Sequence, residues 1–169
     1  MGKKKVYLET TLFNFYLEKK YGTEHVNTVK LFEEIAAGKY EAFTSTYVIR
    51  ELEDTKDEEK RAKMLDLIIK YGITVLDEND DAVDLADIYA EEGVIQRKYM
   101  TDSRHIALAT IYEMDMIVSM NFDHIVKRKT IIMTSHINVQ KGYRAVKICS
   151  PKEVMENDKE VTSDRERDQ

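Results

Sequence analysis

The sequence alternates short apolar runs with longer segments in which apolar residues recur at helical spacing. The apolar runs occupy 5–8, 40–44, 73–76, 145–149 and a stretch that begins at Met116. Strands separated by helices of about a dozen residues are typical of βαβ units, which require a parallel sheet covered on both faces and right-handed crossovers. We therefore predict an α/β fold, a three-layer α/β/α sandwich around a central, mainly parallel sheet of four to five strands.

The longer segments carry the start and stop signals of helices. Gly38 and Gly72 each follow such a segment, at the position where a left-handed turn closes a helix. Ser45 or Thr46 precedes one segment and offers a capping hydroxyl, and Asn79 or Asp80 caps a later one. The apolar periodicity predicts helices that include 12–21, 26–37, 48–52, 57–71, 82–89, 101–109 and 132–139.

The length of 169 residues and the hydrophobic content of 43% suit one domain with a substantial core. We predict a single domain over 1–155, followed by a charged segment, 156–169, that is expected to be disordered. Because Cys149 is the only cysteine, the chain can form no internal disulfide and no cysteine-based zinc site.

Two features of the sequence predict a cytoplasmic protein with no membrane partner. No apolar run approaches the roughly 18 to 20 residues that cross a bilayer. The N-terminal Met-Gly-Lys-Lys-Lys is not followed by the long apolar segment of a secretion signal. The net charge of −6 argues against a protein that covers long stretches of nucleic acid. It is compatible with a local basic patch that contacts a small part of a substrate.

Oxygen-bearing side chains stand near the points where predicted strands end. Glu9 follows the first strand directly, and Asn121 follows the fourth. Glu51 lies in the helix after the second strand, and Asp102 begins the helix before the fourth. The carboxyl ends of parallel strands share one edge of the sheet, so these side chains are expected to lie close together. Any one acid near the start of a helix can be explained by its favourable interaction with the helix dipole. Several unpaired carboxylates beside buried segments, however, repel one another. A hard cation would relieve the repulsion, and Mg²⁺ or Mn²⁺ suits oxygen ligands better than zinc does.

Four segments together resemble the successive motifs of PIN domains, and of the VapC-like members most. The segments are Val6-Tyr7-Leu8-Glu9-Thr10-Thr11, Glu51, Asp102-Ser103-Arg104-His105-Ile106-Ala107 and Ser119-Met120-Asn121-Phe122-Asp123-His124-Ile125. The likeness extends in order from Val6 to about Val154. It implies a PIN-like sandwich, a cluster of three or four acids that binds Mg²⁺ or Mn²⁺, and a metal-dependent endoribonuclease, frequently the toxin of a toxin–antitoxin pair.

Residue by residue, the resemblance assigns the catalytic and metal-binding positions. Glu51 and Asp102 match the second and third acids of the family. Glu9 stands where the family has Asp and is one methylene longer. Asn121 stands at the fourth acidic position and offers only a neutral oxygen, for which Asp123 is expected to compensate as a metal ligand.

The resemblance also implies a reaction, the in-line attack of a metal-activated water on an RNA phosphodiester, with one ion or two. Asp102 and Glu9 are predicted as the main metal ligands, while Glu51 either binds the ion or orients a water as general base. Thr11 matches a hydroxyl position that hydrogen-bonds the first acid or a metal-bound water. The run Lys127-Arg128-Lys129 is the candidate RNA contact, and a solvated charged face is its alternative.

Two other functions stay open from the sequence. Glu9 and Asn121 differ from the acids that the family has at these positions. This difference suggests, as an alternative, a PIN fold with weakened catalysis that serves as a binding protein. Another Mg²⁺-dependent phosphotransfer protein is less well supported. The phosphatase pattern needs a second Asp two residues after the nucleophile, and Glu9-Thr10-Thr11 does not supply it.

Aromatic residues of the first two helices define a candidate docking face for an antitoxin helix or for the second subunit of a homodimer, although some of them must fill the core. They are Phe13, Phe15, Tyr16 and Phe32. His105, in an apolar helix, is predicted to be a packed side chain. The other three histidines do not have the spacing of zinc ligands.

Overall fold

Five parallel strands form the sheet of the described part of the chain, which is residues 2–157 and 167 of a computed structural model. The strands are β1 (Lys4–Leu8), β2 (Tyr40–Ser45), β3 (Thr74–Leu76), β4 (Met116–Val118) and β5 (Lys147–Cys149). Their order across the sheet is β3-β2-β1-β4-β5, and every neighbouring pair is parallel. The predicted parallel sheet is confirmed, with β3 and β5 slightly shorter than the apolar runs that contain them.

β1 occupies the centre of the sheet because, after its two exposed lysines, its side chains are apolar on both faces. Val6, Tyr7 and Leu8 are fully buried, and the strand pairs with β2 on one side and with β4 on the other. A central parallel strand is covered by helices above and below, so its sequence is a continuous apolar run. The three residues of β4 are all buried for the same reason.

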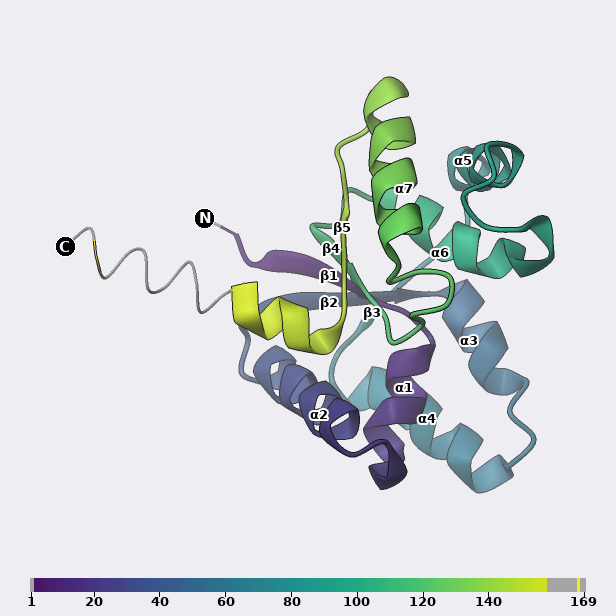
Figure 1. Ribbon diagram of the computed structural model, residues 1–169. Helices are drawn as coiled ribbons and strands as arrows, with labels where there is room; N and C mark the ends of the chain where they lie inside the picture. The colour runs from purple at the N-terminus through teal and green to yellow at the C-terminus, as the bar shows by residue number, and fades with distance from the viewer. Residues whose placement is uncertain (1, 158–166, 168–169) are drawn as a thin grey trace.

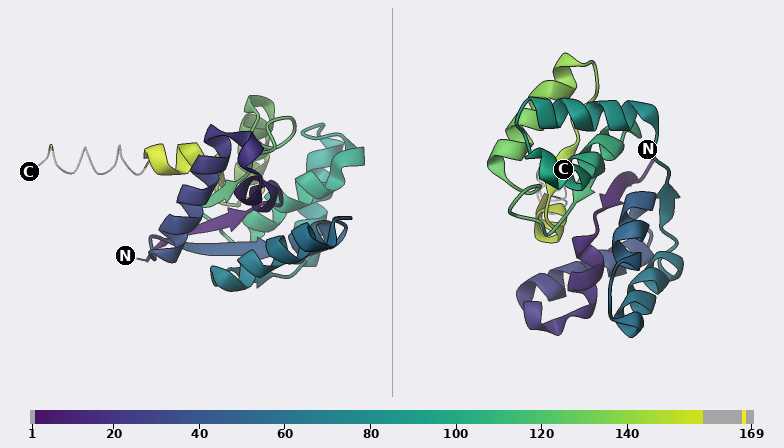
Figure 2. Two further views of the ribbon diagram at one scale, coloured as in Figure 1. Left: turned by 90° about the horizontal axis from the view of Figure 1, so that it is seen from below. Right: turned by 90° about the vertical axis from the view of Figure 1, so that its right-hand side faces the viewer.

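Helices cover both faces of this sheet. They are α1 (Thr11–Leu17), η1 (Lys19–Tyr21), α2 (Thr23–Ala36), α3 (Thr46–Glu53), α4 (Glu58–Lys70), α5 (Asp80–Glu91), η2 (Arg97–Tyr99), α6 (Met100–Ile111) and α7 (Arg128–Gln140), and residues 151–157 are also helical. α1, α2 and α4 lie on one side of the sheet, and α5, α6 and α7 lie on the other (Figures 1 and 2). The predicted three-layer α/β/α sandwich is therefore confirmed.

Two further expectations concern the chain ends and the membrane. The segment 151–157 stays helical past the predicted domain boundary at 155, and most of the segment expected to be disordered lies outside the described residues. Over the described ranges, no helix combines the length and the apolar composition that crossing a bilayer requires.

The helix expected over 12–21 is interrupted at Glu18. α1 ends at Leu17, Glu18 has an extended backbone, and the 3₁₀ turn η1 follows it. The interruption lets the chain fold back, so that the ring of Tyr21 stacks on the ring of Phe15 with centroids 3.9 Å apart. α1 is consequently shorter than its apolar pattern suggests.

Part of the candidate aromatic docking face belongs to the core. Phe13 and Phe32 are fully buried and contact each other edge to face. Tyr16 packs against Phe32 in the same manner, and its hydroxyl hydrogen-bonds the hydroxyl of Tyr71 on α4. These side chains fill the space between α1, α2 and α4, and they are not free to receive a partner helix.

The predicted caps and turns fix where the helices begin and end. Ser45 caps α3, since its Oγ accepts a hydrogen bond from the backbone N–H of Val48. Asn79 caps α5, and its Oδ1 lies 2.8 Å from the backbone nitrogen of Ala82. Gly38 has a φ of +82°, the left-handed conformation that favours glycine after a helix. These local signals place the start of α3 immediately after β2.

The carboxyl ends of the central strands meet at one edge of the sheet. Leu8 of β1 pairs with Val118 of β4, and the backbone N–H of Glu9 donates to the carbonyl of Val118 at 3.0 Å. Ser45, the last residue of β2, leads directly into α3. The residues that follow β1, β2 and β4 therefore gather at this edge, as the parallel topology requires.

Candidate active site

Four of the five side chains predicted to bind metal line one cavity at the carboxyl edge of the sheet. Its volume is about 290 Å³. Glu9 reaches it from the end of β1, Glu51 from α3, Asp102 from the first turn of α6, and Asn121 from the segment after β4. We call it the acidic cavity, and its lining residues are Glu9, Thr10, Thr11, Asn14, Phe15, Glu51, Leu52, Thr55, Lys60, Met64, Asp102 and Asn121.

Glu9 is the most deeply placed of the three carboxylates, with only 2% of its surface exposed. Its Oε1 accepts hydrogen bonds from Ser119 Oγ at 2.6 Å and from Thr11 Oγ1 at 2.5 Å, and a third from the backbone N–H of Thr11. Burial raises the pKa of the Glu9 carboxyl above its ordinary value, although the charge of His105 and the hydrogen bonds from Ser119 and Thr11 act in the opposite direction. The prediction that Thr11 contacts the first acid is consistent with this geometry.

Glu51 is held by a histidine that is fully buried. His105 Nε2 lies 2.6 Å from Glu51 Oε1, which also accepts a hydrogen bond from Thr10 Oγ1. On the other side of the ring, Nδ1 lies 2.7 Å from the hydroxyl of Tyr7, and that hydroxyl lies 2.6 Å from Ser45 Oγ. A continuous buried chain of hydrogen bonds therefore links Glu51 to the two central strands.

The charge of each partner favours the ionised form of the other. Burial acts to lower the pKa of the His105 imidazole, but the hydrogen bond that it donates to Glu51 and the charges of Glu9, Glu51 and Asp102 outweigh it and raise the pKa. Burial acts to raise the pKa of the Glu51 carboxyl, but the hydrogen bond and the charge of His105 outweigh it and lower the pKa. The two groups thus form an ion pair in which the imidazolium donates to the carboxylate.

Asp102 is held by a second histidine. Its Oδ2 lies 2.8 Å from Nδ1 of His124, and the ring of His124 packs against the ring of Tyr99 with centroids 4.0 Å apart. The backbone N–H of His124 donates to Asn121 Oδ1 at 3.0 Å. The amide oxygen of Asn121 therefore closes a local turn, so one of its lone pairs is already used within the chain.

The chemistry of this donor set fits a hard divalent cation, since three carboxylates and an amide oxygen face one cavity. The hydrogen bonds from described residues fall on one oxygen of each carboxylate, namely Glu9 Oε1, Glu51 Oε1 and Asp102 Oδ2. The arrangement of these side chains differs from that of a preformed metal centre. Among the described residues, no three His, Cys, Asp or Glu side chains are grouped closely enough to hold an ion. Glu51 and Asp102 instead turn toward His105 and His124.

The remaining predicted site residues do not enter the acidic cavity. Asp123, Lys127 and Lys129 line a neighbouring cavity, and Arg128 is exposed and lines neither. Asp123 lies in the turn after β4, in which the carbonyl of Asn121 accepts hydrogen bonds from two later backbone N–H groups. Because Asp123 does not line the acidic cavity, it is not among the oxygens that the structure brings together there.

Three side chains of the site were not assigned to it from the sequence. His105 is packed, as predicted, but it is also the partner of Glu51. Its spacing of three residues from Asp102 places both on one face of a helix, which is a signal that could have identified it. His124 likewise lies three residues after Asn121. Lys60 supplies the positive charge in the lining of the acidic cavity, and nothing in its charged, amphipathic helix distinguishes it from its neighbours.

The sheet order, the layers and the carboxylate cavity define an α/β/α sandwich of the PIN-like type. Among solved structures, the chain is similar to one in the crystal structure of VapBC2 from Rickettsia felis bound to a DNA fragment from their promoter. The TM-score is 0.55 with 15% sequence identity, and the match covers 86% of this chain and 98% of that chain. No model of a protein family and no curated protein matches the sequence. At this identity the likeness is one of fold alone.

Proposed function

We propose that this protein is a metal-dependent endoribonuclease in which Glu9, Glu51 and Asp102 hold Mg²⁺ or Mn²⁺. The observation that carries the proposal is the convergence of these three carboxylates, 42 and 51 residues apart along the chain, on one cavity at the carboxyl edge of the sheet. The sequence resemblance to PIN domains and the similarity in fold to a VapBC2 structure support the same class.

When bound, the ion supplies activation of a water and stabilisation of the negative charge that develops on the RNA phosphate. Ser119 and Thr11 fix the rotamer of Glu9 through their hydrogen bonds to Oε1. His105 orients Glu51, which is then placed to hold the ion or to accept a proton from the attacking water. Glu9 therefore enters the reaction already oriented, which lowers the entropic part of the barrier.

We assign Lys60 a role in binding the RNA substrate. Its ammonium is 3.1 Å from Glu18 Oε1, and the residue lines the acidic cavity from α4. An RNA phosphate that approaches three carboxylates is repelled until positive charge offsets them. Lys60 offsets part of that repulsion, and Glu18 keeps its flexible side chain close to the cavity.

The test is cleavage of a single-stranded RNA by the purified protein with Mn²⁺, with and without EDTA. We expect cleavage that EDTA abolishes, and a loss of about 100-fold in kcat/KM for Asp102→Asn, since that change removes one charge from the ion's surroundings. Asp66→Asn is the matched control, because it removes the same charge from an exposed position that lines neither this cavity nor its neighbour. Isothermal titration with Mn²⁺ measures the loss of metal binding independently of cleavage.

Equal cleavage by the wild type and by Asp102→Asn would refute the assignment of the site and would indicate a contaminating nuclease. A wild-type protein that neither cleaves RNA nor binds Mn²⁺ would favour the second candidate function, a PIN-fold binding protein. The specific observation in favour of that candidate is that Glu51 and Asp102 are paired with His105 and His124.

A protein partner of the antitoxin kind is also proposed. The support is the similarity in fold to a chain of VapBC2, which was crystallised with a promoter DNA fragment. The resemblance to VapC-like PIN domains, many of which act in the cytoplasm as toxins, leads to the same expectation. Light scattering of the protein alone and after co-expression with its chromosomal neighbour distinguishes a homodimer from a complex of two different chains.

A further inference from the structure

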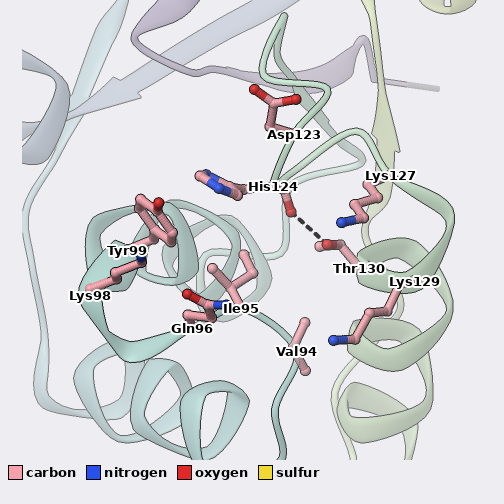
Figure 3. A pocket seen from close by; sticks show the side chains of 10 residues that line it. All are labelled: Val94, Ile95, Gln96, Lys98, Tyr99, Asp123, His124, Lys127, Lys129 and Thr130. Carbon is pink, nitrogen blue, oxygen red and sulfur yellow. Dashed lines mark hydrogen bonds between the residues drawn. The ribbon is translucent and has the colours of Figure 1, made fainter.

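A second cavity adjoins the acidic cavity and has the opposite electrostatic character. Its volume is about 300 Å³. Lys98 comes from η2, and Lys127 and Lys129 come from the start of α7, so cations from two distant segments share one hollow (Figure 3). We call it the basic cavity, and its lining residues are Val94, Ile95, Gln96, Lys98, Tyr99, Asp123, His124, Lys127, Lys129 and Thr130.

The positive charge of the basic cavity is largely uncompensated. The ion pairs formed between described residues include none of its three lysines, and Asp123 is the one acid in its lining. In Figure 3 the ammonium groups of Lys127 and Lys129 lie on the same side of α7, toward Ile95 and Gln96. Cations held near one another in a hollow repel, and an anion bound between them relieves that repulsion.

A hydrogen-bonded pair of side chains connects the linings of the two cavities. His124 lines the basic cavity and hydrogen-bonds Asp102, which lines the acidic cavity. Thr130 of α7 fixes the position of His124 by donating a hydrogen bond to its carbonyl at 2.5 Å (Figure 3). A strand whose one phosphate lies at the acidic cavity therefore has its neighbouring phosphates close to the lysines.

The geometry points to the basic cavity as a binding site for a phosphodiester group of single-stranded RNA, adjacent to the phosphate that is cut. This inference rests on the proposed function and names where its substrate is held. The ring of Tyr99 is covered by His124 on one side and has the ammonium of Lys98 4.9 Å from its centroid. Tyr99 is still 37% exposed, so the ring contacts do not decide whether a base stacks there, and it is the three lysines that make this a site for the phosphate backbone.

The experiment measures RNA binding in the absence of cleavage. A fluorescein-labelled single-stranded RNA is titrated with protein in EDTA, and fluorescence anisotropy gives Kd at several KCl concentrations. We expect Lys127→Ala/Lys129→Ala to weaken binding at least tenfold at low salt. We also expect the slope of log Kd against log salt to fall by about 1.4, since each phosphate contact on a single strand contributes about 0.7.

The matched control is Lys141→Ala/Lys147→Ala, which removes two exposed lysines outside the basic cavity and keeps the net charge equal to that of the first variant. Urea unfolding verifies that both variants are folded. Equal losses of affinity in the two variants would overturn the inference in favour of general charge attraction. A wild-type protein that does not bind the RNA would overturn it as well, and an acidic protein partner would then be the better occupant. Binding that depends on Lys127 and Lys129 in a protein that never cleaves RNA would support the cavity while refuting the nuclease.

Discussion

Glu9→Gln is expected to lower kcat/KM for RNA cleavage by about 1,000-fold and, at the same time, to make the folded protein more stable. Activity is lost because Glu9 is the most buried of the three carboxylates. Little water surrounds it, so its charge interacts most strongly with a bound cation. The gain follows because Gln keeps an oxygen that accepts from Ser119 and Thr11 but carries no charge to desolvate. Cleavage assays and urea unfolding of the same preparation measure the two effects.

The stability gain has a defined pH dependence. The folded state raises the pKa of Glu9 above its ordinary value near 4.5, so the ionised carboxylate destabilises the fold when the pH is above the folded pKa. As the pH falls through the folded pKa and then below 4.5, Glu9 becomes protonated in both states and the advantage of Gln disappears. The unfolding free energies of variant and wild type should therefore differ at pH 7 and converge in acid.

Glu41→Gln is the matched control, because Glu41 is an exposed residue of β2 and lines neither cavity. It should change neither cleavage nor stability appreciably. A Glu9→Gln protein that still cleaves RNA at the wild-type rate would remove Glu9 from the metal site. One that is less stable than the wild type at pH 7 would contradict the assigned cost of burying this charge.

His105→Ala is expected to lower the free energy of unfolding by about 3 kcal/mol. The change leaves Glu51 and the buried hydroxyl of Tyr7 without their partner, and breaking a buried ion pair typically costs about 3–5 kcal/mol. The lower end applies because the side chain of Glu51 is 37% exposed, so water replaces part of the lost interaction. His136→Ala is the control for loss of a histidine outside this network.

His105→Gln isolates the charge, since the amide keeps hydrogen-bonding groups of similar reach. The raised pKa of His105 means that its stabilising charge is fully present below its ordinary value of about 6.5 and is lost as the pH rises through the folded pKa. The lowered pKa of Glu51 means that its contribution is present above about 4.5 and is lost as the pH falls through the folded pKa. The difference in unfolding free energy between wild type and His105→Gln should be largest between these two values. A difference that is the same at pH 5.5 and pH 9 would show that the pair is not ionic.

The sheet and the meeting of the distant acids could be predicted because both follow from topology. Val6–Leu8 of β1 and the whole of β4 are continuous apolar runs, which is typical of strands buried on both faces of a parallel sheet. Once the strands are parallel, the residues that follow them share one edge, and Glu9 and Asn121 lie together there whatever their separation in the sequence. Local signals such as Ser45 then fixed the start of the helix that carries Glu51.

The partners of those acids could not be predicted, because they depend on contacts that no local pattern encodes. His105 and Tyr7 are 98 residues apart and meet only in the folded core. A histidine in an apolar helix has the same appearance whether it fills space or orients a carboxylate. The position of Asp123 in the lining of the other cavity could not be predicted for a related reason, since the turn that follows Asn121 contains backbone hydrogen bonds that no side-chain pattern encodes.

The attachment of Glu51 to Tyr7 has a consequence for the motions of this protein. Tyr7 belongs to the strand that is paired on both sides, so the hydroxyl that contacts His105 is carried by the most protected part of the sheet. Amide protons of the central strand should consequently exchange with deuterium only through global opening, while those around Asp102 and His124 exchange through smaller fluctuations. Glu51 is then tied to the slowest-opening part of the domain, whereas Asp102 is tied to a histidine whose side chain is 28% exposed.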